Sequence, residues 1–151
     1  MKSLLEEKNP ALDGVLAELS SEGFRLTPQR VAIIKLLVSH EHHYNAEQLY
    51  EIIQRDFPTT SRATIYKTLL ALKNMGKLME LTLPSAPSRY DYKNSIPHAH
   101  LVCTICQSVS DAEMPLEEDH ARRVASQYGF INVTQRLDFF GICPDCQTLV
   151  R

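Results

Sequence analysis

The sequence predicts an α+β protein of two domains, an N-terminal winged helix-turn-helix domain and a C-terminal α/β domain. Helical periodicity runs through the first half and gives way to short strand patterns after Gly76. All four cysteines lie beyond that change, in residues 103–146. The length of 151 residues leaves room for one ordinary domain or two small ones, and a chain that is 44% hydrophobic and 23% charged is typical of globular proteins.

Composition also excludes several classes of protein. No stretch approaches the roughly 18 to 20 apolar residues that a membrane span needs. Acidic residues stand near the N-terminus, where a signal peptide needs an apolar segment. We therefore expect a cytoplasmic protein that has no membrane partner. The formal net charge of −2 does not by itself indicate a nucleic-acid-binding protein.

Three helices are expected before residue 58. The first carries apolar residues at helical spacing and ends before Gly23. The second opens with Thr27 as N-cap and Pro28 in the first helical position. The third begins near Asn45 and ends before Pro58, because the residue preceding a proline disfavours the α conformation.

A fourth helix, from Ser61 to Gly76, is the expected reader of DNA. Strand patterns at 78–83 and 89–92 follow it as a hairpin, and helices followed by a hairpin outline a winged helix-turn-helix. Two windows, 23–40 and 57–79, contain basic residues and no acidic ones, so they can form a positive face toward phosphates. The candidate DNA-contacting residues are Arg25, Arg30, Arg62, Thr64, Tyr66 and Lys67. A plain helical domain with a solvated polar face is the alternative.

Residues 93–97 are expected to form a hinge linker between a DNA-binding domain, residues 1–92, and a second domain, residues 98–151. In the second domain the patterns predict strands at 98–102, 108–112 and 132–140, and a helix at about 116–128.

Two C-x-x-C pairs indicate a structural zinc site. Cys103 and Cys106 form one pair, and Cys143 and Cys146 form the other. Two tight turns of this kind supply four thiolates, which is the tetrahedral set that zinc prefers. Two disulfides or a redox-active pair are the alternatives, but disulfides are rare in a cytoplasmic chain and a redox motif needs no duplicate.

A second metal site is suggested by His98 and His100, whose side chains share one face of a strand. Asp91 and Asp111 lie near enough in sequence to contribute carboxylates. Cys103 is an odd number of residues away, so its sulfur should point to the opposite face and the two sites should be separate. Exposed or hydrogen-bonded histidines are the commoner case. A further cluster, His40, His42 and His43, could equally complement the C-terminal charge of a helix.

Taken together, these motifs resemble the ferric uptake regulator family. The matching segments are GFRLTPQR at 23–30, His43 followed by Ala46 and Glu47, SRATIY at 61–66, RYD at 89–91, HAH at 98–100, both C-x-x-C pairs and FGIC at 140–143. The resemblance implies a homodimeric repressor that binds palindromic double-stranded DNA and whose C-terminal domain is the dimerisation domain. It also implies structural Zn²⁺ in the four cysteines and a regulatory Fe²⁺ or Mn²⁺ at the hinge.

Carried over from the family, the regulatory ligands would be His43, Asp91, His98, His100 and Asp111. An aspartate at the last position is typical of the peroxide-sensing branch, whereas iron-sensing members usually have glutamate there. In that branch Fe²⁺ reacts with hydrogen peroxide and oxidises a ligand histidine, here His43 or His98. The resemblance thus implies a metal-dependent repressor that senses hydrogen peroxide.

Two departures and two alternatives accompany this interpretation. Gln107 replaces the glycine that usually follows the first C-x-x-C pair, and Pro97, Ala99 and Gln135 stand where some iron sensors carry a further metal site. An iron- or zinc-responsive uptake regulator of the same family is the main alternative. An enzyme is disfavoured, because four cysteines on one zinc leave no open coordination position and no additional general base is evident.

Overall fold

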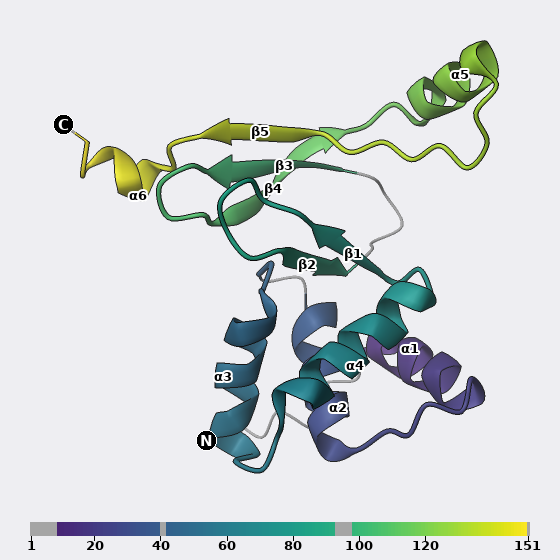
Figure 1. The fold of residues 1–151 in the computed structure, drawn as a ribbon, viewed down its shortest axis with the longest axis vertical. Coiled ribbons are helices and arrows are strands. Elements are labelled where there is room, and N and C mark those ends of the chain that lie inside the picture. Colours follow the sequence, from purple (N-terminus) through teal and green to yellow (C-terminus); the bar gives the residue numbers. More distant parts are fainter. Residues whose placement is uncertain (1–8, 40–41, 93–97, 151) are drawn as a thin grey trace. The chain divides into compact units, whose positions relative to one another are not determined.

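The structure is a computed structural model that describes residues 9–39, 42–92 and 98–150. The chain divides into two compact units, Met1–Tyr92 and Lys93–Arg151, each described here by itself (Figure 1). The expected linker, 93–97, lies outside the described residues. Within the described ranges, none of the helices is both long and apolar enough to cross a membrane.

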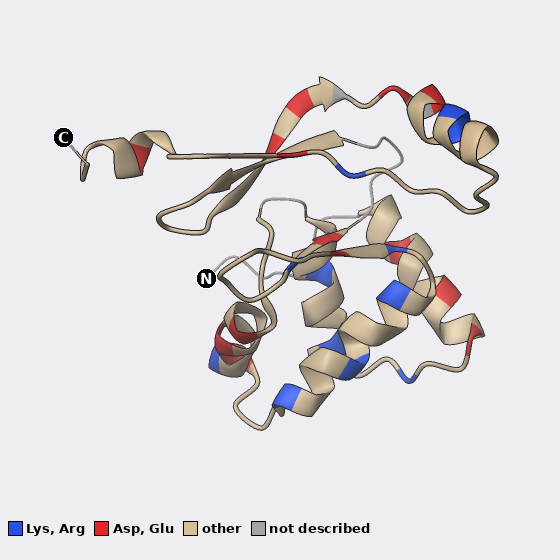
Figure 2. Cartoon of the chain, turned by 45° about the horizontal axis from the view of Figure 1, so that its top comes forward, with Lys and Arg blue, Asp and Glu red and all other residues tan. Residues whose placement is uncertain are grey.

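The first unit has the expected order of four helices and a hairpin. The helices are α1 (Pro10–Ser21), α2 (Pro28–Val38), α3 (Ala46–Asp56) and α4 (Arg62–Asn74). The strands β1 (Leu78–Leu81) and β2 (Arg89–Tyr92) then pair antiparallel (Figure 1). Arginine and lysine recur along α4, which carries no acidic residue (Figure 2). The winged helix-turn-helix outline is therefore confirmed.

Side chains at the helix starts explain why these helices begin where they do. Thr27 Oγ1 accepts from the N–H of Arg30 at 3.4 Å, and Pro28 occupies the next position, where a missing N–H costs nothing. Ser61 caps α4 by accepting from the N–H of Thr64 at 3.2 Å. Each cap satisfies a backbone donor that would otherwise have no partner in the first turn.

The core of the first unit is built around α2 and α4. Ile33 and Ile34 of α2 are fully buried, as are Ile65 and Leu72 of α4. Burying a side chain of this size stabilises the fold by about 1.5–3 kcal/mol before entropy costs. Thr68 is also fully buried in α4, and its hydroxyl donates to the carbonyl of Thr64 at 2.8 Å. The core thus fixes which face of α4 remains for solvent.

The described part of the second unit is a three-stranded sheet with two helices. Its elements are β3 (His98–Cys103), β4 (Val109–Pro115), α5 (Glu118–Tyr128), β5 (Asp138–Gly141) and α6 (Pro144–Gln147). The strand order is β4-β3-β5, in which β4 is antiparallel and β5 parallel to β3 (Figure 1). The α+β class is confirmed.

One strand expectation is wrong in length. The sequence pattern predicts a strand over 132–140, but pairing is restricted to Asp138–Gly141. The paired residues run from His100 opposite Asp138 to Cys103 opposite Gly141. Asn132 also has a φ of 55°, which lies outside the extended region. The short helix α6, inside the second C-x-x-C pair, was not expected.

Candidate metal centres

The four cysteines meet because β5 pairs parallel with β3. That pairing sets Cys103 opposite Gly141, and the N–H of Thr104 donates to the Gly141 carbonyl at 2.8 Å. The turn after β3 and the start of α6 therefore converge, and the four Sγ atoms all lie within 4.8 Å of one another. All four residues are free cysteines.

The sulfur spacing matches a tetrahedral metal site. Cys106 Sγ and Cys143 Sγ are 3.8 Å apart. A tetrahedron with Zn–S bonds of about 2.3 Å has sulfur–sulfur edges of about 3.8 Å. The geometry of this cluster therefore fits Zn²⁺ and leaves no coordination position for a substrate.

The thiols of this cluster ionise unequally. Backbone N–H groups, chiefly that of Cys143 at 3.4 Å, lower the pKa of Cys103 to about 6. The Ser108 hydroxyl, 3.1 Å from Cys106 Sγ, lowers the pKa of Cys106. Contact with the Cys143 thiol raises the pKa of Cys146 to about 12. Four thiolates this close together need a cation, and a dication provides the missing positive charge.

A backbone bridge in the first unit sets His43 against Asp91. The N–H of Tyr90 in β2 donates to the Tyr44 carbonyl at 2.8 Å, and the bridge is antiparallel. In that register the preceding residue, His43, faces the following one, Asp91, and His43 Nε2 lies 3.5 Å from Asp91 Oδ1. By contrast, the exposed His42 packs edge-to-face on Tyr44. His40 lies outside the described residues.

The cap of α3 anchors this bridge. Asn45 Oδ1 accepts from the N–H of Gln48 at 2.8 Å, and Gln48 Oε1 accepts from the N–H of Asn45 at 3.0 Å. This reciprocal capping box fixes the chain immediately after Tyr44. Gln48 Oε1 also accepts from the guanidinium of Arg89, next to Tyr90. The start of α3 and the start of β2 are thus tied together beside the His43–Asp91 pair.

In the second unit, His98 and His100 converge on one carboxylate. The antiparallel register sets His100 of β3 opposite Asp111 of β4. His98 Nε2 lies 3.0 Å and His100 Nε2 4.0 Å from Asp111 Oδ1. Two imidazoles and a carboxylate suit Fe²⁺, Mn²⁺ or Zn²⁺. The described part of this unit therefore has two separate groups of metal-binding side chains, one of sulfur and one of nitrogen and oxygen.

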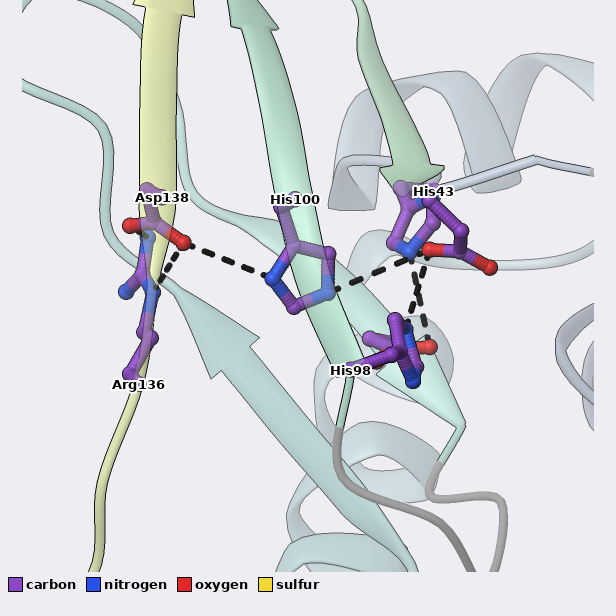
Figure 3. Close-up of polar contacts among 7 residues, drawn as sticks. His43, His98, His100, Arg136 and Asp138 are labelled. Carbon is purple, nitrogen blue, oxygen red and sulfur yellow. Dashed lines mark hydrogen bonds and ion pairs between the residues drawn. The ribbon is translucent and has the colours of Figure 1, made fainter. Parts of the chain in front are cut away.

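Sequence reasoning missed two residues beside this group. Asp138 of β5 lies on the other side of His100, with its Oδ1 3.4 Å from His100 Nδ1 (Figure 3). Arg136 Nε donates to Asp138 Oδ1 at 3.0 Å, and Arg136 Nη2 lies 2.6 Å from Asp138 Oδ2. The contact between Asp138 and His100 depends on the parallel register of β5 on β3. A single sequence does not reveal that register.

The candidate DNA-contacting residues lie at the starts of two helices. Tyr66 and Lys67 are exposed on α4, whereas Thr64 is half-buried. Arg62 forms an ion pair with Glu47 of α3 and stacks over the Tyr50 ring at 4.2 Å.

Arg25 and Arg30 stand on either side of the α2 cap. Arg30 Nη1 donates to the Arg25 carbonyl at 2.6 Å, and its guanidinium lies 4.3 Å from the centre of the Phe24 ring. The guanidinium groups of Arg30 and Arg62 are thus already oriented by neighbours within this unit.

A winged helix-turn-helix unit, followed by a unit with separate sulfur and nitrogen–oxygen metal sites, defines a metal-responsive DNA-binding regulator. The model of the ferric uptake regulator family matches residues 21–140. The chain belongs to this family, and it is a transcriptional regulator rather than an enzyme.

The similarity to known repressors of this family extends over nearly the whole chain. The peroxide-responsive repressor PerR of Staphylococcus aureus (strain Mu50 / ATCC 700699) is 35% identical over 144 residues, which cover 95% of this chain and 96% of that protein. The chain is therefore similar in sequence to a repressor of the family over nearly its full length.

Solved structures share the fold. The ferric uptake regulator Fur of Helicobacter pylori has a TM-score of 0.74 at 21% identity, with 97% of each chain covered. A zinc-bound manganese uptake regulator has a TM-score of 0.64 at 29% identity, covering 85% of this chain and 98% of that one. In this chain, the four cysteines suit zinc and the His/Asp group suits iron or manganese.

Proposed function

We propose that this protein is a peroxide-responsive repressor whose regulatory site holds Fe²⁺ or Mn²⁺. The observation that carries the proposal is that the carboxylate facing both His98 and His100 belongs to an aspartate, Asp111, rather than to a glutamate. The 35% identity with the peroxide-responsive repressor of S. aureus, over nearly the full length of both chains, supports it.

The regulatory ion takes ligands from both units in this proposal. His43 and Asp91 contribute from the first unit, and His98, His100 and Asp111 contribute from the second. Support comes from the short distances within each set, 3.5 Å for His43–Asp91 and 3.0 Å for His98–Asp111. An ion that binds all five favours one relative orientation of the units, and it does so only by its greater affinity for that orientation.

The same proposal includes a homodimer on a palindromic operator. The second unit exposes apolar side chains that a partner could cover, because patches of this kind mark interaction surfaces. Leu101, Tyr128, Phe130, Ile131 and Phe140 are among these exposed side chains. A two-fold dimer presents two α4 helices to two half-sites, with Arg25, Arg30, Arg62, Thr64, Tyr66 and Lys67 as contacts. We infer a cytoplasmic location, because both the operator DNA and reduced cysteines are found there.

Loss of repression follows from oxidation of a ligand. Bound Fe²⁺ supplies the reactivity toward hydrogen peroxide. One oxygen atom of the peroxide is inserted into a histidine ring, His43 or His98, and the other leaves as water. The oxidised ring is a poorer ligand, so the units lose their common orientation and the DNA is released. The zinc-bound cysteines take no part, since coordination protects their thiolates.

The test compares two metal forms of the full chain on DNA. The duplex is selected from a random pool by the Mn²⁺-loaded protein, and gel shifts are recorded before and after peroxide. Fe²⁺-loaded protein should release the duplex and gain the mass of one oxygen on a peptide containing His43 or His98, while Mn²⁺-loaded protein should retain the duplex. Equal release from both forms, without histidine oxidation, would remove the peroxide-sensing function.

A metal-uptake regulator of the same family is the second candidate. The 29% identity with a zinc-bound manganese uptake regulator favours it, and so does a ligand set that suits several divalent metals. It predicts DNA binding that follows the concentration of one metal and that peroxide leaves unchanged in every metal form.

A further inference from the structure

We propose that Asp138, held by Arg136, is a positioning residue that fixes the tautomer of His100 and so selects Nε2 as its metal-binding atom. The inference deepens the proposed function and rests on its assignment of His100 as a regulatory ligand. Asp138 is not itself placed among the ligands.

The geometry around His100 separates its two ring nitrogens. Nδ1 points toward Asp138 on β5, with Oδ1 at 3.4 Å (Figure 3). Nε2 is on the side of Asp111 on β4, with Oδ1 at 4.0 Å. His100 stands on the central strand of the sheet, so both neighbours are fixed by strand pairing. The parallel register sets His100 directly opposite Asp138.

The Asp138 carboxylate is held in orientation from its other side. Both of its oxygens are engaged by Arg136, whose Nε donates to Oδ1 at 3.0 Å and whose Nη2 lies 2.6 Å from Oδ2. A two-point contact of this kind fixes the plane of a carboxylate, which a single contact does not. The Asp138 side chain is 13% exposed, so little water competes for Oδ1.

These contacts decide which nitrogen can bind a metal. A neutral imidazole has one N–H and one lone pair, and the partner of one nitrogen sets the role of the other. With its N–H on Nδ1, facing the Asp138 carboxylate, His100 has its lone pair on Nε2, on the side of Asp111 and His98. Metal-binding histidines commonly donate their second nitrogen to a carboxylate in this way, and removal of that carboxylate typically weakens metal binding about 10- to 100-fold.

The tautomer can be read without any regulatory metal. In full-length protein that holds zinc in its cysteines and no other ion, long-range ¹H–¹⁵N spectra distinguish Nδ1–H from Nε2–H for each neutral histidine. We expect His100 to be the Nδ1–H form in the natural chain and a mixture of both forms in Asp138→Ala. An Nε2–H form of His100 in the natural chain would overturn the inference.

Metal affinity supplies the second readout. Mn²⁺ binding, followed by the electron paramagnetic resonance of free Mn²⁺, should weaken about 10- to 100-fold in Asp138→Ala and recover at least in part in Asp138→Glu, which restores an acceptor. Asp119→Ala is the matched control, because Asp119 is an exposed partner of Arg122 on α5 and should leave affinity unchanged. Unchanged Mn²⁺ affinity in Asp138→Ala, with zinc retained, would contradict a positioning role.

A further variant, His100→Ala, distinguishes failure of the positioning inference from failure of the proposed function. His100→Ala should lose Mn²⁺ affinity whatever the role of Asp138. If His100→Ala binds Mn²⁺ as the natural chain does, the ligand assignment itself is wrong. If only Asp138→Ala is unaffected, the ligand assignment stands and the positioning inference falls.

Discussion

Cys103 and Cys146 belong to one cluster of thiols but differ widely in acidity. Backbone N–H groups lower the pKa of Cys103 to about 6, whereas the neighbouring Cys143 thiol raises that of Cys146 to about 12. At neutral pH, without metal, Cys103 is a thiolate and Cys146 a thiol. Near neutral pH, zinc binding therefore displaces a proton from Cys146 and none from Cys103. Below about pH 6, where Cys103 is also protonated, zinc binding displaces a proton from both residues.

This difference predicts how zinc binding depends on pH. Protons compete with zinc for thiolates, so affinity should fall as the pH is lowered, and more steeply below about pH 6, where Cys103 must also lose a proton. Zinc competition against a chromophoric chelator across this range measures the effect. The number of protons released for each zinc ion bound should rise as the pH falls through about 6. An affinity independent of pH would show that the four thiols are not the ligands.

In the proposed function, the Asp111 carboxylate determines whether the protein responds to peroxide. We expect Asp111→Glu to keep Mn²⁺-dependent DNA binding, because a carboxylate remains to bind the ion. The longer side chain moves that carboxylate relative to His98, so oxidation of the histidine by peroxide should be blunted. Gel shifts and peptide mass spectrometry on Fe²⁺-loaded protein measure both properties. An unchanged peroxide response would remove the distinction drawn from aspartate at this position.

At the scale of elements, one face of α4 packs in the core and another face, which we propose contacts DNA, is exposed to solvent. Leu69 is 2% exposed and packs in the core, whereas the next residue, Leu70, is 55% exposed. The exposed side also carries Tyr66 and Lys67. Substitutions on the two faces should therefore separate effects on stability from effects on the proposed DNA contact.

Two neighbouring substitutions test that separation. Leu69→Ala should lower the free energy of unfolding by about 2–5 kcal/mol, because it removes buried methyl groups and leaves a cavity. Leu70→Ala is the matched control, with an expected change within about 0.5 kcal/mol. Urea unfolding followed by circular dichroism compares the two. Equal destabilisation by both would mean that the faces of α4 are assigned wrongly.

The elements were predictable where a local signal marks them. Thr27, Asn45 and Ser61 begin α2, α3 and α4 as expected, because an N-cap acts within its own turn. The strand at 132–140 was overestimated, since β5 is limited to the residues that pair with His100–Cys103 of β3. Strand length is a property of the pair, which one segment does not encode.

The candidate sites divide in the same way. Spacing alone brings His98 and His100 to one face and the cysteines into two turns. The contact of His43 with Asp91 depends on the bridge from Tyr44 to Tyr90, and that of Asp138 with His100 depends on a parallel register. These are contacts between segments distant in sequence. The resemblance to a family supplied His43, whereas nothing in the sequence indicated Asp138.

At the scale of the whole molecule, regulation requires that metal in one place changes DNA affinity in another. The chain has two compact units, with DNA-contacting candidates in the first and the thiolate site in the second. The proposed regulatory ion draws on both units, so its binding energy can favour one relative orientation. Couplings of this kind typically change affinity about 5- to 150-fold.

The most direct test removes two ligands of that ion and leaves the zinc site intact. His98→Ala/His100→Ala is compared with the natural chain and with His42→Ala/His120→Ala, which removes two exposed histidines outside the proposed site. Binding to the selected palindromic duplex is measured with and without Mn²⁺. The account predicts that Mn²⁺ raises DNA affinity about 5- to 150-fold in the natural chain and the control, and not at all in the ligand variant. Full Mn²⁺-dependent binding by His98→Ala/His100→Ala would contradict it.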